Sequence, residues 1–311
     1  MIAAQQIEYF TNTDKALLRA IMYFDVFNYP ITAEEALAFA PLSIDHSSKP
    51  RLQNLVDEKV IFKLGKFYSI QNNFELVERR LRGNLLAERK MKTAEKYSRL
   101  ISSFPFVRGV LLSGSISKGF MDETSDIDYF IITEAKRLWI VRSLLAIFRR
   151  VFLFNSSKNL CTNYFIDTEN LSIPDRNIFT ATELCTLKSM YGQGFIQKFQ
   201  DANRWALTIL PQENFDGAVP TDKVFFIKNA IERFFSFAAM DKFNQWLMKK
   251  SRIFWKRKYS KTVSGSDFEI AFRTQEGVSK GHPRFFQKRA LDQLQQRISA
   301  FEMLNNIDLK L

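Results

Sequence analysis

The segment GVLLSGSISKGFMDETSDIDYFIIT, residues 109–133, holds two apolar runs separated by a polar stretch. The first run ends at Ser113, and two carboxylates two residues apart, Asp126 and Asp128, open the second. Because successive strand residues point to opposite faces, the pattern predicts two strands and places both carboxylates on one face. Adjacent carboxylates repel each other unless a cation lies between them. The sequence therefore predicts a metal site, and oxygen-only ligands suit Mg²⁺.

The turn after the first strand has features of a phosphate-binding loop. Gly114 and Ser115 follow the strand and are expected to open a short helix. Backbone N–H groups in such a turn can cradle phosphate oxygens, and a glycine lets a phosphate approach closely. Lys118, one turn further on, can add a positive charge. These residues lie opposite the aspartates, which predicts that a phosphate and a metal ion meet between the two strands.

This segment resembles the DNA polymerase β-like nucleotidyltransferases, in which a strand is followed by Gly-Ser, a short helix and a second strand that starts with Asp-x-Asp. Ten residues separate Ser115 from Asp126, and SGSISKGFMDETSDIDYFIIT is similar to the minimal members of that group, which commonly show Gly-Ser-x-x-Arg-Gly before Ser-Asp-Ile-Asp. Lys118-Gly119 replaces Arg-Gly here, which keeps the charge but loses the forked geometry of arginine. The resemblance covers about 60 residues, to the end of the third core strand.

The resemblance implies a role for each of these residues. Asp126 and Asp128 would bind Mg²⁺, which bridges the triphosphate of an incoming nucleotide. Gly114, Ser115, Lys118 and Ser125 would contact the nucleotide. A second metal ion would activate an acceptor hydroxyl for in-line attack on the α-phosphorus, releasing pyrophosphate.

Members of this family usually carry a third carboxylate on the next core strand, which here reads LCTNYFID, residues 160–167. Asn163 stands at the central position, where the family pattern has aspartate. Asp167 has the same parity and is expected to face the same side, although it lies near the end of the strand. Asparagine is a neutral ligand and a poor base. Either Asp167 supplies the third carboxylate or the site is weakened as a catalyst.

The composition of the chain indicates its partners and its cellular location. The 311 residues carry 45 Lys and Arg against 33 Asp and Glu, and this excess points to an acidic partner or to a basic surface. Two cysteines and two histidines form no metal or disulfide pattern, so a reducing, cytoplasmic location is expected. The N-terminus shows no signal-peptide pattern. Charges interrupt the apolar stretches 138–154 and 224–240, so no stable membrane insertion is expected, and amphipathic helices are favoured over interfacial attachment.

Residues 1–72 resemble a winged helix-turn-helix: three helices and a two-stranded hairpin around Gly65. Thr32 and Glu35 form a capping-box pattern at the second helix. Seven basic and eight acidic side chains in residues 1–70 favour a packing role over DNA contact, because phosphate contacts dominate DNA affinity. DNA contact stays open if the basic residues share one face. That face would combine Lys49, Arg51, Lys63 and Lys66.

The rest of the chain divides into a linker helix (73–104), a mixed-sheet nucleotidyltransferase core (105–178) and a helical C-terminal domain (179–311), giving an α+β protein. The segment 211–222 is expected to be a loop. Residues 242–266 hold eight basic side chains, interleaved aromatics and no acidic one, which suits a nucleic-acid acceptor or a helix with a basic outer face. Lys256, Arg257 and Lys258 are the candidate acceptor-binding residues. His282 is expected to be structural.

The sequence favours Mg²⁺-dependent transfer of a nucleotidyl group from a nucleoside triphosphate to a hydroxyl acceptor. It does not choose between RNA, a protein and a small molecule as the acceptor. Two alternatives remain: a catalytically weakened, nucleotide-binding regulator, and a DNA-binding protein whose core senses nucleotide. The oligomeric state is not predicted.

Overall fold

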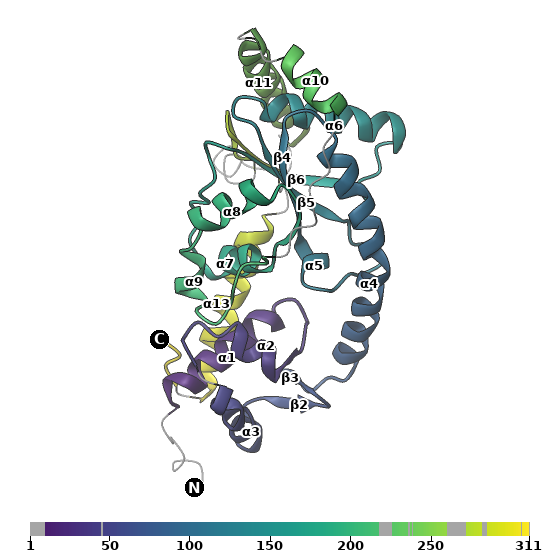
Figure 1. Cartoon of the computed structure of the whole chain (residues 1–311). Helices are drawn as coiled ribbons and strands as arrows, with labels where there is room; N and C mark the ends of the chain where they lie inside the picture. Colours follow the sequence, from purple (N-terminus) through teal and green to yellow (C-terminus); the bar gives the residue numbers. More distant parts are fainter. Residues whose placement is uncertain are drawn as a thin grey trace, which may run out of the picture.

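The computed structural model describes residues 10–44, 46–217, 226–235, 237, 239–259, 272–281, 285–305 and 307–310. The described chain is a mixed α+β protein with a six-stranded mixed sheet, a small three-stranded antiparallel sheet and a mainly helical C-terminal part. Figure 1 shows the small sheet and the six-stranded sheet at different levels of the molecule, with the long helix α4 running between them.

The N-terminal unit contains helices and a hairpin in the predicted order. Its elements are α1 (Asn12–Asp25), β1 (Ile31–Thr32), α2 (Ala33–Ala38), the 3₁₀ turn η1 (His46–Ser48), α3 (Lys49–Asp57), β2 (Phe62–Leu64) and β3 (Phe67–Ser69). The predicted capping box at α2 is confirmed, because Glu35 N–H donates to Thr32 and Thr32 N–H donates to Glu35. The hairpin is also confirmed, and β1 adds a third strand to it in the order β1-β3-β2. The winged-helix assignment itself stays a prediction.

The N-terminal unit shares its core with the end of the chain. Helix α13 (Phe286–Asn305) contributes buried Leu294, Ile298 and Phe301 to the same apolar cluster as α1. Arg297 of α13 donates to Asp25 of α1 at 2.7 Å. Figure 1 shows the C-terminus beside α1. The first 72 residues are therefore not packed as a separate body.

Helix α4 (Glu75–Ser102) is the predicted linker helix, and it leads into the six-stranded sheet. The central strands are β4 (Val107–Ser113), β5 (Asp128–Thr133) and β6 (Cys161–Asp167), as the apolar runs predicted. Helix α5 (Gly114–Ser117) joins β4 to β5, and α6 (Leu138–Phe152) joins β5 to β6. Strand β5 pairs antiparallel with β4 and parallel with β6.

The C-terminal part is mainly helical, as expected, but three short strands after residue 179 complete the sheet, which therefore extends beyond the predicted core of residues 105–178. The order is β7-β4-β5-β6-β9-β8. Strand β7 (Lys188–Tyr191) lies beside β4, whereas β9 (Val278–Lys280) and β8 (Thr274–Gln275) extend the sheet beyond β6. Strands of two to four residues show no usable periodicity. Of the predicted loop 211–222, residues 218–222 lie outside the described part of the chain, as does His282.

Helices cover both faces of the six-stranded sheet. One face packs against α4, α6 and α11 (Ala239–Tyr259), and it carries Tyr129 and Ile131 of β5. The other carries Phe130 and Ile132, and it packs against α7 (Ile178–Thr186), α8 (Gln193–Ala202) and α9 (Ala206–Ile209). Helix α10 (Phe226–Phe234) docks through Lys228, whose Nζ donates to the carbonyls of Ser102 and Val107 at 2.9 and 2.7 Å. The alternation along β5 fixes which helices face the aspartates.

Candidate functional site

The two aspartates lie where β4 ends and β5 begins. Ser113 pairs with Asp128 across the antiparallel ladder, and Asp128 pairs with Cys161 on its other side. Asp128 has the strand parity of Phe130 and Ile132, so its side chain belongs to the α7 face of the sheet. Asp126 precedes β5 by two residues and accepts a hydrogen bond from Ser157 Oγ at 2.8 Å. The sheet thus places Asp128 in a central position with neighbours from both flanking strands.

Gly114 packs directly against the Asp128 carboxylate. Its φ is +71°, a conformation that other residues rarely adopt, and a Cβ added there would lie 2.6 Å from Asp128 Oδ2. Both the turn and the close approach therefore require glycine. The backbone of the predicted phosphate loop is in contact with the predicted metal ligand, as the sequence indicated. This contact is the strongest geometric feature of the site.

Asp128 carries a perturbed proton affinity. Burial, and then the nearby charges of Asp126 and Glu183, raise its pKa to about 7, while the Cys161 thiol and Lys118 act in the opposite direction. Asn163 Nδ2 donates to Asp128 Oδ1 at 2.6 Å, and Cys161 Sγ donates to Asn163 Oδ1 at 3.2 Å. Burial also raises the pKa of the Cys161 thiol. Without a cation, this environment therefore leaves a substantial protonated fraction of Asp128 at neutral pH.

Asn163 occupies the third-strand position beside the aspartates, but Asp167 does not. The register from Tyr129–Thr162 to Phe130–Tyr164 skips Asn163, and this irregularity turns the asparagine toward Asp128. Asp167 instead pairs with Thr133, at the opposite end of β5 and about 17 Å along the strand at 3.3 Å per residue. There its carboxylate accepts from Glu169 N–H and Asn170 Nδ2 in a turn. The role of third carboxylate is therefore withdrawn from Asp167, because equal parity does not mean the same end of a strand.

Lys118 pairs with a residue for which the sequence analysis gave no role. Its Nζ donates to Glu183 Oε1 at 2.6 Å and to the Gly114 carbonyl at 3.1 Å. Glu183 comes from α7, which crosses the same face as Asp128. The available signal was slight: Glu183 is the one charged residue in the stretch NIFTATELCTL, residues 177–187. No motif connects that stretch with the aspartates, so only tertiary packing shows the relation.

The loop between α5 and β5 is held from outside the sheet. Ser125 Oγ accepts from Asp122 N–H at 3.0 Å, which closes a turn, and its nucleotide contact stays a prediction. Asn84 of α4 donates to the Gly119 carbonyl at 2.6 Å. The Phe120 ring packs edge-on against Tyr29, with ring centroids 5.4 Å apart. The loop between α5 and β5 is therefore anchored on α4 and on the N-terminal unit.

The two predicted basic surfaces lie apart from the aspartates. Lys256, Arg257 and Lys258 are exposed in the last turn of α11, a helix on the opposite face of the sheet. In the N-terminal unit, Lys49 pairs with Glu34 at 2.7 Å, and Arg51 Nε donates to Asp14 at 2.8 Å. The bonds from Arg51 and Thr11 outweigh the effect of burial and lower the pKa of Asp14. Two of the four side chains of the proposed DNA-contacting face are thus engaged in internal ion pairs.

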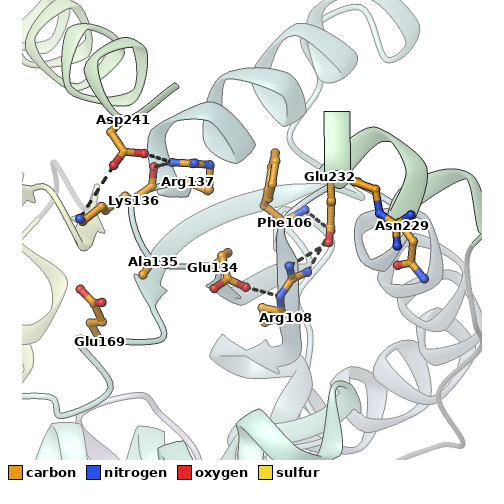
Figure 2. Close-up of a pocket in the computed structure, with 11 residues that line it drawn as sticks. Phe106, Arg108, Glu134, Ala135, Lys136, Arg137, Glu169, Asn229, Glu232 and Asp241 are labelled. Carbon is orange, nitrogen blue, oxygen red and sulfur yellow. Dashed lines mark hydrogen bonds and ion pairs between the residues drawn. The ribbon is translucent and has the colours of Figure 1, made fainter. Parts of the chain in front are cut away.

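A cavity lies at the other end of the sheet. It measures about 820 Å³ and is lined by residues from β4, the turn after β5, α10 and α11 (Figure 2). Four basic and four acidic side chains line it. Arg108 pairs with Glu134 at 2.6 Å and with Glu232 at 2.8 Å, and Arg137 pairs with Asp241 at 2.5 Å. Opposite charges balance across this cavity, and the pairs tie α10 and α11 to the core.

Among the described residues, the His, Cys, Asp and Glu side chains form no group of three or more arranged to hold a metal ion. The helices of the described ranges also include none that is both long and apolar enough to cross a membrane. Comparisons with family models, with curated proteins and with solved structures found no match to this chain.

Proposed function

We propose that this chain binds a nucleoside triphosphate with Mg²⁺ at the aspartate pair and transfers its nucleotidyl group to a hydroxyl acceptor. One observation carries the proposal: the Asp128 carboxylate is packed against the positive-φ turn at Gly114, with Asp126 two residues away. The contact between Asp128 and this turn supports a site where a metal ion and a phosphate would meet. The strand order and the motif spacing support the same conclusion.

The residues present fit one divalent cation. Burial first, and then the neighbouring Asp126, raise the pKa of Asp128 to about 7, so the ionised carboxylate is disfavoured in the free protein and a cation would favour it. Asp126 and Asp128 would hold Mg²⁺, and a bound Mg²⁺ ion would neutralise phosphate charge and orient the nucleotide. Gly114 and Ser115 would receive phosphate oxygens through their backbone N–H groups. Lys118 would contribute its ammonium group to the same phosphates.

A second candidate function is nucleotide binding without efficient transfer. It is favoured by the neutral Asn163 at the third-strand position and by the distance of Asp167 from the pair. In this case the protein would report on nucleotide levels as a regulator. The DNA-binding alternative is less well supported, because Lys49 and Arg51 are already paired within the N-terminal unit.

Incubation with each α-labelled NTP, Mg²⁺ and a cell lysate tests the transfer. Label on a lysate component, abolished by Asp128→Asn, is the expected result. Thermal unfolding with NTP and Mg²⁺ tests binding separately, and wild-type protein should gain melting temperature whereas Asp128→Asn should not. Asp167→Asn is the matched control, since it makes the same chemical change at the far end of the sheet. Loss of the thermal shift in the Asp167 variant but not in the Asp128 variant would refute the proposed site.

A further inference from the structure

Lys118 lies between the phosphate loop and a carboxylate of α7. Its Nζ is 2.6 Å from Glu183 Oε1 and 3.1 Å from the carbonyl oxygen of Gly114. The Lys118 side chain is 21% exposed and that of Glu183 is 28% exposed, so both border on solvent. The ammonium group is thus already at the turn that a triphosphate would contact. A phosphate bound there would compete with Glu183 for the Lys118 ammonium group.

Glu183 is connected to the aspartates through Lys118 and the turn at Gly114. Lys118 Nζ bonds both Glu183 and the Gly114 carbonyl, and a Cβ added at Gly114 would lie 2.6 Å from Asp128 Oδ2. Glu183 therefore borders the same turn as Asp128, and it comes from a helix. The neutral Asn163 leaves Asp128 as the carboxylate that the described strands β5 and β6 supply at this end of the sheet.

We propose that Glu183 is the third acidic group of this site and that it accepts the proton of the acceptor hydroxyl. Before a triphosphate binds, Lys118 forms an ion pair with Glu183. A bound triphosphate breaks this pair because Lys118 then binds the phosphate instead. The inference rests on the proposed nucleotidyl transfer and assigns its missing carboxylate. It places the third acidic residue on a helix above the sheet rather than on the third strand. It also makes the Lys118–Glu183 pair a contact that holds the site in a resting state.

The chemical step balances without a further reactant. The acceptor O–H bond breaks, and its proton passes to a Glu183 oxygen. The acceptor oxygen forms a bond to the α-phosphorus, while the bond from that phosphorus to the bridging oxygen breaks. Pyrophosphate leaves with the electron pair, and Glu183 afterwards releases its proton to water.

A purely structural ion pair makes different predictions. If the pair were purely structural, its loss would leave nucleotide affinity unchanged. Because the pair is partly exposed, its loss would also change folding stability little. If Glu183 competes with phosphate for Lys118, its neutralisation should strengthen nucleotide binding, because the competing charge is removed. Opposite changes in affinity and in transfer are therefore the signature of the proposed role.

The test compares full-length wild type with Glu183→Gln, Lys118→Gln and Glu134→Gln. Binding of ATP, GTP, CTP and UTP is measured by calorimetry in EDTA, so that Lys118 and not a metal ion dominates the phosphate contact. Transfer is measured with Mg²⁺ and labelled NTP. Glu134→Gln is the matched control, because Glu134 is also in a 2.6 Å ion pair but at the other end of β5.

We expect Glu183→Gln to bind NTP about fivefold more tightly, the value of a weak, partly exposed ion pair. Its transfer rate should fall by about 100-fold or more, as for the loss of a general base. Lys118→Gln should bind NTP more weakly, and Glu134→Gln should behave as wild type.

Weaker NTP binding by Glu183→Gln would overturn the proposal, because Glu183 would then be orienting Lys118 for phosphate. Unchanged affinity would refute the resting-state contact, and unchanged transfer would refute the proton-acceptor role. If wild type bound NTP but transferred nothing, the regulator function would stand and Glu183 would lose its catalytic role. If wild type bound no NTP at all, the proposed function itself would fail.

Discussion

Replacement of Asp128 by asparagine should stabilise the protein at alkaline pH. The folded-state pKa of Asp128 is raised to about 7 by burial and by Asp126, against a value of about 3.9 in an unfolded chain. The folded state therefore holds a proton that the unfolded state releases between these values. Stability linked to Asp128 is greatest below about pH 4, falls as the pH rises through the folded pKa, and stays low above it. Asparagine removes this dependence.

The magnitude follows from the shift. About three pKa units at 1.36 kcal/mol each give a penalty of at most about 4 kcal/mol at pH 8. The Asp128 side chain retains some solvent contact, so screening reduces this to about 2 kcal/mol. Asparagine at position 128 can still accept the 2.6 Å hydrogen bond from Asn163. Asp128→Asn should therefore gain about 2 kcal/mol at pH 8 and clearly less at pH 4.5.

Urea unfolding of wild type and variant at the two pH values measures this difference directly, because all other titrations are common to both proteins. A gain that grows from pH 4.5 to pH 8 supports the reasoning, and it would show stability given up for function. An equal effect at both pH values, or a loss at pH 8, would show that Asp128 is ionised without penalty. The charge imbalance inferred for the site would then not exist.

Three further predictions concern glycine, a buried arginine and the basic surface. Gly114→Ala should destabilise the protein more than Gly119→Ala. Both glycines have φ +71°, which costs alanine about 1–2 kcal/mol, but only a Cβ at Gly114 would meet Asp128. Equal losses of stability in urea unfolding would contradict the close packing. Arg80→Met should cost about 3 kcal/mol, because Arg80 is buried, bonds Glu35 at 2.7 Å and stacks on Tyr29. Arg82→Met, with an exposed pair at 3.6 Å, should change less than about 0.5 kcal/mol in the same assay. Replacing Lys256, Arg257 and Lys258 by Gln should reduce the slope of log affinity for RNA against log salt concentration by up to about 2, at about 0.7 for each lost contact. The double replacement Lys63→Gln with Lys66→Gln should leave that slope unchanged. The reverse result would identify the N-terminal hairpin as the binding surface.

The central elements could be predicted because their signals are local. The apolar runs beside Ser113 and after Asp128 gave β4 and β5, and the capping residues Thr32 and Glu35 gave the start of α2. The meeting of Gly114 with Asp128 also followed from the sequence, because a short connection between antiparallel strands returns the chain to its starting edge. Residues close in sequence thus placed half of the candidate site.

The other half depends on contacts between distant segments. Parity suggested Asp167, but the irregular register at Asn163 and the length of β6 put Asp167 at the wrong end. Glu183 reaches the site only because α7 packs on the face of Phe130 and Ile132. Strands β7, β8 and β9 are too short for their side chains to show a period, and their pairing is decided by the edges that β4 and β6 leave open.

The N-terminal unit supports both segments that carry the candidate site. It contacts the loop between α5 and β5 through Tyr29, which packs against Phe120. It also contacts α7, because the Tyr23 hydroxyl is hydrogen-bonded to Thr182, the residue before Glu183. Lys118 and Glu183 therefore both sit on segments that the N-terminal unit supports. A displacement of that unit would alter the separation of the two charges, whereas its own basic side chains Lys49 and Arg51 are already neutralised by internal partners.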